Sequence, residues 1–560
     1  MQPDVHESFA SLDAILEQLS PYASPVEREA LAQISAYLAE VRPRSSLDGS
    51  WGRVLRDSVT FAVMRRVSRE SFYTARVIDL SARTINSILA RQPYARVHVE
   101  HADRLDRPSI KALARAMLLL DPEQRFAWIW HFGSDPLSAS AAPGDLYAAS
   151  RIALLKQLLG ILSPSLVREG VGSPVRGPDA HDVAGLDDMA SELVMQNYDR
   201  CFLIGDALLH SCDRSMASEI LRLTGLAAIN VGRAEDALDA LDAAEHGAAT
   251  GRRAHLAYLQ GLIESKRRYD LAASTAQYQR GLDLLASAHD SDADMALEHG
   301  WLLNGLALNE AILWRRAGGS KEHHGTAFAL EREAFELVRD GDSAARIYLR
   351  FNLLANSALL MEMAGEYDVA IDIFHKTFDF DVDRSASSRR RWESTMGYRI
   401  GVLQYQAGRY DEAYRMLHHA AEQDDATESW PVQERIVRAL AIVAMARGST
   451  AEAEMLFRGG LEGCRKARAA DGACEHARGL VSALVAAERF DVAQDVVSEL
   501  REEEGIDLAE PLEQIRPKPP SGKLPAYFPE IDLEGVPAID LNRYLGTASA
   551  PGAGSAPWRN

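Results

Sequence analysis

The stretch ALLMEMAGEYDVAIDIFHKT, residues 358–377, shows a spacing of residue types that recurs through the second half of the chain. The small residue Ala358 is followed by Gly365, by an aromatic residue, by Ala370 and then by the large apolar Phe374. This order predicts two short helices packed across a tight turn, because small residues permit close approach and glycine permits the turn. One such helix pair cannot bury its own apolar face, so it needs neighbours stacked on either side.

The same order of residue types returns three times before residue 500, and looser versions precede it. In the last copy, Glu488 stands where the earlier copies have the turn glycine. The later copies are Gly401, Gly408, Tyr410, Ala413 and Leu417; then Ala441, Gly448, Ala453 and Phe457; then Val481, Phe490, Ala493 and Val497. The earlier versions are Gly225, Gly232, Ala237 and Leu241, a looser set that begins at Trp301 and Gly305, and a degenerate pair around 256–285.

This pattern resembles the tetratricopeptide (TPR) repeat family, although successive copies are 40 to 43 residues apart and the usual period is about 34. The longer spacing indicates longer helices or loops. The resemblance implies a mainly α fold in which a TPR-like α-solenoid occupies residues 187–510. In such arrays the first helix of each pair lines a concave face, where an extended protein or peptide segment binds.

Polar residues on the first helices are the candidates for contacts with a bound segment. In TPR proteins of the peptide-clamp kind, Asn and Arg side chains at such positions bind backbone amides and carboxylates, so the resemblance implies the same role here. The alternative is that they are ordinary solvated or inter-repeat polar groups. The candidates are Asn304, Asn309, Asn352, Asn356, Arg399, Gln404 and Arg438.

Ahead of the repeats, short apolar runs alternate with helical patterns. Strands are predicted at 76–80, 96–100 and 126–132, with helices at 82–91 and about 109–120 between them. This alternation is typical of a parallel α/β sheet. A further helix is predicted at 146–162, followed by a Gly-, Pro- and Ser-rich flexible segment at 163–180.

The segment EHADRLDRPSIKALAR, residues 100–115, resembles the Walker B region of the STAND-type P-loop ATPases, a group that includes the large LuxR-type regulators. The resemblance implies that Glu100 and Asp106 correspond to residues that hold Mg²⁺ in the family. An intact GxxxxGK[ST] loop is missing, and Gly52 and Arg53 stand in its GlyLys positions. We therefore expect a small, degenerate P-loop-like α/β domain with no bound cofactor. An unrelated small α/β or helical domain is the alternative.

These patterns divide the chain into five predicted segments. Residues 1–44 form N-terminal helices, and residues 45–135 form the degenerate nucleotide-binding-like domain. Residues 136–186 contain a connecting helix and a flexible linker, and 187–510 contain the repeats. The segment 511–560 is a Pro-rich, partly disordered tail.

Composition excludes several functions. The net charge of −20 disfavours nucleic acid as a direct partner. No apolar run reaches the length of about 20 residues that a membrane span needs. The four cysteines and the polar start of the chain favour a cytoplasmic protein. The Cys and His residues lack CxxC spacing, so no metal site is expected, and no GxSxG or HExxH motif indicates an enzyme.

The sequence therefore favours a non-catalytic scaffold or adaptor that binds a protein or peptide. Two alternatives stay open. One is a signalling or transcription-linked STAND-type regulator without its own DNA-binding domain, and the other is a subunit of an enzyme complex. The sequence indicates neither the partner nor the oligomeric state.

Overall fold

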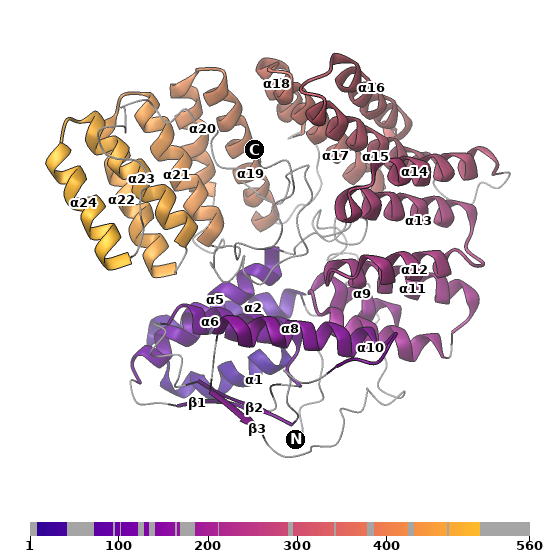
Figure 1. Cartoon of the computed structure of the whole chain (residues 1–560), viewed down its shortest axis with the longest axis horizontal. Coiled ribbons are helices and arrows are strands. Elements are labelled where there is room, and N and C mark those ends of the chain that lie inside the picture. The colour runs from indigo at the N-terminus through magenta and orange to yellow at the C-terminus, as the bar shows by residue number, and fades with distance from the viewer. Residues whose placement is uncertain are drawn as a thin grey trace. The chain divides into compact units, whose positions relative to one another are not determined.

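A computed structural model gives the structure of the chain (Figure 1). Residues up to Leu360 belong to one compact unit, and described residues from Met361 onward belong to a second. The described residues are 8–41, 72–92, 96–100, 102, 104–120, 128–133, 140–162, 165–168, 185–210, 212–288, 295–340, 343–377, 386–423, 430–467 and 470–504. The expected tail at 511–560 lies outside them.

The first unit begins with helices and a small parallel sheet. Its sheet has the order β1–β2–β3, with all three strands parallel. Ahead of the repeats the elements are α1 (Ala10–Leu19), η1 (Ser20–Tyr22), α2 (Pro25–Val41), α5 (Phe72–Ala90), β1 (Val97–Val99), α6 (Arg107–Leu118), β2 (Trp128–Phe132), α8 (Leu146–Leu162), β3 (Ser165–Arg168), α9 (Leu186–Val194) and α10 (Tyr198–Leu209).

The central strand β2 shows why this sheet forms. Trp128, Trp130 and Phe132 alternate with less buried residues, and each of the three is almost completely buried. Period-two alternation of this kind is typical of a strand with one face against the core. In register, Val99 of β1 lies opposite Trp130, and Phe132 lies opposite Arg168 of β3. The predicted strands at 96–100 and 126–132 are confirmed, with shorter bounds.

The predicted strand at 76–80 is wrong, because these residues belong to α5. Val77, Ile78, Ile85 and Ile88 are buried, and their spacing is that of one helix face. A short apolar run is ambiguous between strand and helix, and Ser81, at the end of this run, is buried inside α5.

The strand β3 lies inside the segment 163–180, which was predicted as a flexible linker. That prediction is wrong for residues 165–168, which pair with β2 along its length. Four residues are too few to show a period, so their pairing depends on the neighbouring strand. The alternation of strands and helices is therefore β1–α6–β2–α8–β3.

From α11 onward the chain consists of successive helix pairs, which confirms the mainly α, TPR-like solenoid (Figure 1). We call the members of a pair its first and second helices. The pairs are α11 (Arg214–Asn230) and α12 (Ala234–Ala244); α13 (Thr250–Ile263) and α14 (Leu271–Ala286), joined through the π-helical turn η2 (Glu264–Arg268); α15 (Met295–Arg316) and α16 (Lys321–Val338); α17 (Ala344–Met363) and α18 (Tyr367–Thr377); α19 (Ala386–Gln406) and α20 (Tyr410–Gln423); α21 (Trp430–Ala446) and α22 (Thr450–Ala467); α23 (Ala470–Ala486) and α24 (Phe490–Glu504).

The predicted turn positions are confirmed by their backbone angles. The glycines have φ values of 82°, 80°, 77° and 78° at Gly232, Gly365, Gly408 and Gly448. Glu488 adopts the same left-handed conformation, with a φ of 58°. This conformation ends a helix and lets the next one start, and it favours glycine because a Cβ atom is strained there.

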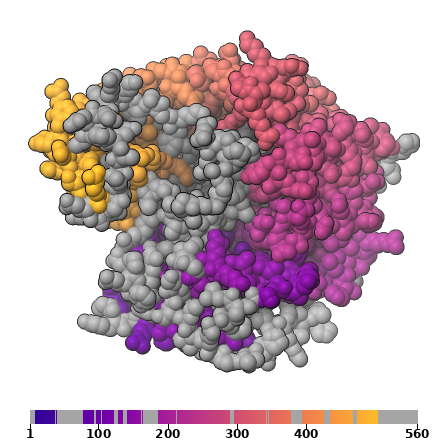
Figure 2. All heavy atoms as spheres, viewed as in Figure 1, coloured from indigo at the N-terminus to yellow at the C-terminus, as the bar shows by residue number. Residues whose placement is uncertain are grey.

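The predicted close contacts between paired helices are also confirmed. A Cβ atom added at Gly401 would lie 2.8 Å from Cγ of Leu417, and one added at Gly225 would lie 3.0 Å from Cγ of Leu241. A large side chain of the second helix therefore packs directly against the backbone of the first helix at its glycine. In the magenta part of the chain, side chains fill the spaces seen between the ribbons (Figure 2). No helix in the described ranges combines the length and the apolar character needed to cross a bilayer.

Candidate functional site

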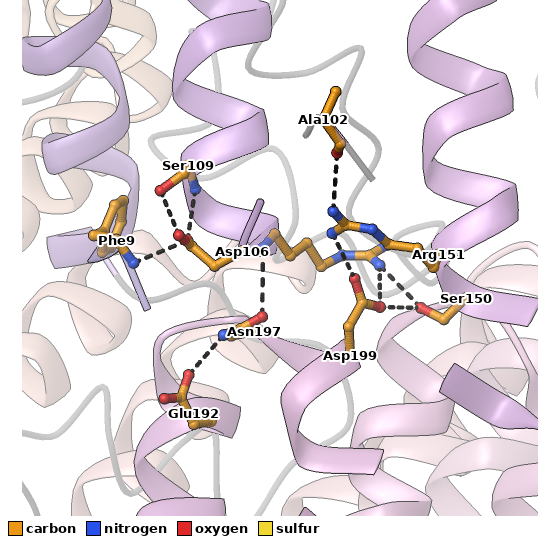
Figure 3. A network of polar contacts seen from close by, with 10 residues as sticks. Phe9, Ala102, Asp106, Ser109, Ser150, Arg151, Glu192, Asn197 and Asp199 are labelled. Atoms are coloured by element: carbon orange, nitrogen blue, oxygen red, sulfur yellow. Dashed lines mark hydrogen bonds and ion pairs between the residues drawn. The ribbon is translucent and has the colours of Figure 1, made fainter. Parts of the chain in front are cut away.

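The predicted nucleotide-site remnants do not come together as a described site. Gly52 and Arg53 lie outside the described residues, and Glu100 is exposed just after β1. Asp106 is 3% exposed and caps α6. Its carboxylate accepts hydrogen bonds from the backbone N–H of Ser109 and of Phe9, both at 2.9 Å (Figure 3). Asp106 thus holds the start of α6 to the N-terminal helix, and its assignment as a nucleotide-site remnant stays a prediction.

A buried ionic network, which we call the buried join, connects Arg107, Ser150, Arg151 and Asp199 (Figure 3). The Asp199 carboxylate of α10 accepts hydrogen bonds from Arg107 Nη1 at 2.9 Å and from Ser150 Oγ at 2.6 Å. Arg151 of α8 lies 3.4 Å from the other carboxylate oxygen and donates to the carbonyl oxygen of Ala102 at 3.2 Å. All four side chains are buried. The buried join fixes α6 and α8 to α10 within the first unit.

Glu192 continues the buried join toward the N-terminus. Its carboxylate accepts hydrogen bonds from Ser8 and, at 2.9 Å, from Asn197 Nδ2, while Arg200 Nε lies 3.4 Å away. Burial raises the pKa of this carboxyl to about 7, although Arg200 and the hydrogen bonds oppose the rise. Glu192 therefore changes charge near neutral pH.

A pocket of about 600 Å³ lies in the first unit, at the N-terminal ends of several first helices. Residues of α11, α13 and α15 contribute to it, together with the start of α9 and the turn at 247–249. We call it the first-helix pocket. Its lining includes Leu186, Met216, Glu219, Arg252, His255 and Glu298. Because each helix pair brings its first helix to the same side, charges far apart in sequence meet here.

The charged groups of the first-helix pocket are paired both within one helix and across helices. Glu219 of α11 binds Arg222 at 2.5 Å and Arg252 of α13 at 2.9 Å. His255 Nδ1 lies 3.2 Å from Oε2 of Glu298 in α15. Burial alone would raise the pKa of Glu219, but Arg222, Arg252 and His255 together lower it to about 2. Glu219 therefore carries its negative charge at any pH near neutral.

Beside these charges the pocket has an apolar part. Met216, which is 39% exposed, and Leu186 line the same cavity. A mixture of an apolar surface and paired charges suits a ligand that offers both a hydrophobic side chain and hydrogen-bonding groups, as a peptide does.

The structure places the predicted asparagines inside the repeats. Asn304, Asn309 and Asn352 are buried, and Asn356 is half-buried. Asn356 Nδ2 donates to Asn304 Oδ1 at 2.6 Å, and Asn352 Nδ2 donates to the carbonyl oxygen of Tyr348. Asn309 Nδ2 donates to Ser274 and Thr275, both at 3.0 Å. The contacts of Asn304, Asn309 and Asn356 match the alternative role of inter-repeat polar groups, whereas Asn352 bonds within its own helix. Peptide binding by the asparagines stays a prediction.

The other three candidates lie in the second unit. Arg399 of α19 lies over the Phe374 ring at 5.7 Å, and burial lowers its pKa although Glu362 opposes this. Gln404, five residues further along α19, is half-buried. Arg438 of α21 is paired with Glu434 at 2.9 Å and with Glu475 at 3.4 Å. The seven candidates therefore fall in both units, and peptide binding by Arg399, Gln404 and Arg438 also stays a prediction.

The residues of the first-helix pocket were missed by the sequence prediction. A signal for them exists, because Glu219 and His255 each precede a close-contact glycine, Gly225 or Gly261, by six positions. Aligning the first helices on these glycines would have placed the charges on one face. The sequence prediction aligned the repeats on the turn glycine alone, and that alignment identified residues of the core.

Comparisons with known proteins give limited likenesses. No protein-family model and no curated protein matches the chain. Among solved structures, the apo form of RapI is similar with a TM-score of 0.43 and 14% identity, over 56% of this chain and 85% of that one. The apo form of the quorum sensor NprR from B. thuringiensis gives a TM-score of 0.35 and 15% identity, over 56% of this chain and 95% of that one.

A third solved structure matches more of the chain. The STAND protein with a tetratricopeptide repeat sensor, PH0952 from Pyrococcus horikoshii, is similar with a TM-score of 0.42 and 10% identity, over 86% of this chain and 72% of that one. The STAND resemblance of the front region stays a prediction.

Proposed function

We propose that this chain is a non-catalytic scaffold or adaptor that binds a peptide or protein segment in the first-helix pocket. The observation that carries the proposal is the pocket itself, a cavity of about 600 Å³ where three first helices meet. Its volume falls in the range of ligand sites, about 300–1,000 Å³.

The paired charges support a peptide rather than a purely apolar ligand. Glu219 is bound by two guanidinium groups, so it orients Arg222 and Arg252 and keeps them fixed before a ligand arrives. Arg252 remains 40% exposed at its side chain and can donate further hydrogen bonds to a peptide carbonyl or carboxylate. Met216 provides an adaptable apolar contact.

The proposal is tested by affinity purification with the full chain and its Arg252→Glu variant. Reversing this charge places two carboxylates together in the pocket, so the captured partner should bind at least about tenfold more weakly. Arg458→Glu is a matched control, because Arg458 is also a half-exposed arginine paired with a glutamate, on α22. An Arg252→Glu variant that retains every partner of the wild type, with equal affinity, would contradict the proposal.

A further inference from the structure

Three side chains that commonly bind metal ions converge in the interior of the second unit. Glu434 comes from α21, Cys464 from α22 and His476 from α23. Their exposed fractions are 6%, 0% and 0%. One ligand atom of each lies within 4.8 Å of the others. A carboxylate, a thiol and an imidazole brought together by three separate helices form a donor set that suits Zn²⁺.

The polar atoms of this cluster are poorly satisfied by the protein. Neither ring nitrogen of His476 makes a hydrogen bond to a described residue. Oε1 of Glu434 lies 2.9 Å from Arg438 Nε, an ion pair without hydrogen-bond alignment. His476 Nε2 and Glu434 Oε1 approach to 3.4 Å without hydrogen-bond alignment. Buried polar atoms almost always have partners, so a fully buried imidazole with two unbonded nitrogens indicates a missing partner.

The distances fit a small divalent cation. Zn²⁺ bonds of about 2.0–2.3 Å in a tetrahedron place neighbouring ligand atoms about 3.3–3.8 Å apart. The 3.4 Å between His476 Nε2 and Glu434 Oε1 already matches such an edge. The other ligand atoms, within 4.8 Å, reach it by shifts of about 1 Å or less.

Two glycines make room for the cluster. A Cβ atom at Gly460 of α22 would lie 2.0 Å from Cε1 of the His476 ring, and one at Gly472 of α23 would lie 2.8 Å from Sγ of Cys464. Any side chain at these positions would displace a donor group. The neighbouring Gly459, by contrast, has nothing within 4 Å of its Cβ position.

The charges around the cluster balance when a divalent cation is bound. A thiolate and a carboxylate neutralise Zn²⁺, while Arg438, beside Glu434, is balanced by Glu475. Without a cation, burial raises the pKa of the Cys464 thiol to about 12, with Glu434 adding to the rise. Binding of the metal therefore releases a proton from the thiol.

We infer that Glu434, Cys464 and His476 bind a Zn²⁺-type divalent cation that joins α21, α22 and α23. A water molecule completes the four-coordinate shell. The sequence prediction of no metal site depended on CxxC spacing, which describes ligands on one loop. Here the ligands lie on three helices, 30 and 12 residues apart in sequence, and only the fold brings them together.

Cobalt substitution tests this inference in the full chain, purified without a histidine tag. After removal of metals with a chelator, Co²⁺ alone is added. The wild type should bind about one Co²⁺ per chain, with the visible absorption of tetrahedral cobalt and an ultraviolet thiolate-to-cobalt band. Added Zn²⁺ should displace the cobalt and remove both absorptions.

Variants identify the ligands. Cys464→Ser should lose the thiolate-to-cobalt band, and His476→Gln should lose most of the bound cobalt. Cys474→Ser is the matched control, because Cys474 lies on α23 outside the cluster and should keep the full spectrum. A wild-type chain without a tetrahedral cobalt spectrum, or a Cys474→Ser variant that loses it, would overturn the inference. The wild-type measurement decides the matter even if a ligand variant fails to fold.

Discussion

The first-helix pocket and the buried join lie in the same unit but hold their charges in different surroundings. In the pocket, Glu219 is paired with arginines at a surface that solvent reaches, and its pKa falls to about 2. In the buried join, Glu192 is enclosed, and burial raises its pKa to about 7. Neighbouring cations therefore determine the direction of the pKa shift of Glu219, and desolvation determines that of Glu192.

This difference distinguishes polar groups that a ligand can reach from polar groups that stabilise the fold. Charges in the buried join are matched by fixed partners and exclude other ligands. Charges in the pocket are matched and still accessible, so a ligand can exchange there. The Glu434–Cys464–His476 cluster of the second unit is a third case, since it is buried but neither ring nitrogen of His476 has a hydrogen-bond partner among the described residues.

The largest effect is expected from Asp199→Ala in the buried join. The change leaves Arg107 and Arg151 buried near each other without their shared carboxylate. The free energy of unfolding should fall by about 3–5 kcal/mol. Glu219→Ala, which removes the carboxylate shared by the buried Arg222 and the 40% exposed Arg252, should cost less, about 1–3 kcal/mol. Denaturant titration of both variants measures the two values, and equal losses would remove the distinction between the regions.

The two glutamates should respond to pH with opposite signs. The folded-state pKa of Glu192 is raised, so its contribution to stability is present below about pH 4.5 and is lost as the pH rises through about 7. That loss amounts to at most about 3 kcal/mol. Glu192→Gln should therefore gain stability relative to the wild type as the pH rises from about 4.5 to about 7, the interval between the two pKa values.

Glu219 should show the reverse dependence. Its folded-state pKa is lowered, so its contribution is present above about pH 4.5 and is lost as the pH falls toward about 2. Comparison of Glu219→Gln with the wild type by thermal unfolding across this range measures it. A difference between the two proteins that does not shrink at acid pH would contradict the assignment.

A smaller effect is expected where the cluster depends on a glycine. Gly460→Ala drives a methyl group into the His476 ring, and should lower the free energy of unfolding by about 1–3 kcal/mol. Gly459→Ala, one position earlier in α22, meets nothing and should raise it by up to about 1 kcal/mol. Denaturant titration distinguishes the two, and equal effects would show that the His476 ring is not seated on Gly460.

The smallest effect is expected at a turn that belongs to neither region. Glu488 has a left-handed backbone, which is strained for a residue with a side chain, so Glu488→Gly should gain up to about 1 kcal/mol. Gly448→Ala at the corresponding turn should lose about 1–2 kcal/mol. Thermal unfolding measures both, and a loss for Glu488→Gly would mean that its side chain stabilises the turn.

The repeat geometry was predictable because it is local. A turn glycine and a small residue facing a large one, such as Gly401 and Leu417, act within one helix pair, so their spacing is visible in sequence. The first half of helix α5 and the strand β3 were not predicted, since short apolar runs take their conformation from neighbours. The pocket and the cluster were missed for the same reason, because they join residues of separate helices.

Site-specific photo-cross-linking tests the central claim, that the first-helix pocket is the binding surface. A photoreactive phenylalanine replaces Met216, which lines the pocket, or Met455, which is 65% exposed on α22 and serves as the control. In the native host, position 216 should give a discrete adduct with a peptide or protein, and Arg252→Glu should abolish it. Position 455 should give none. Absence of an adduct at 216, or the same adduct from both positions, would contradict the claim.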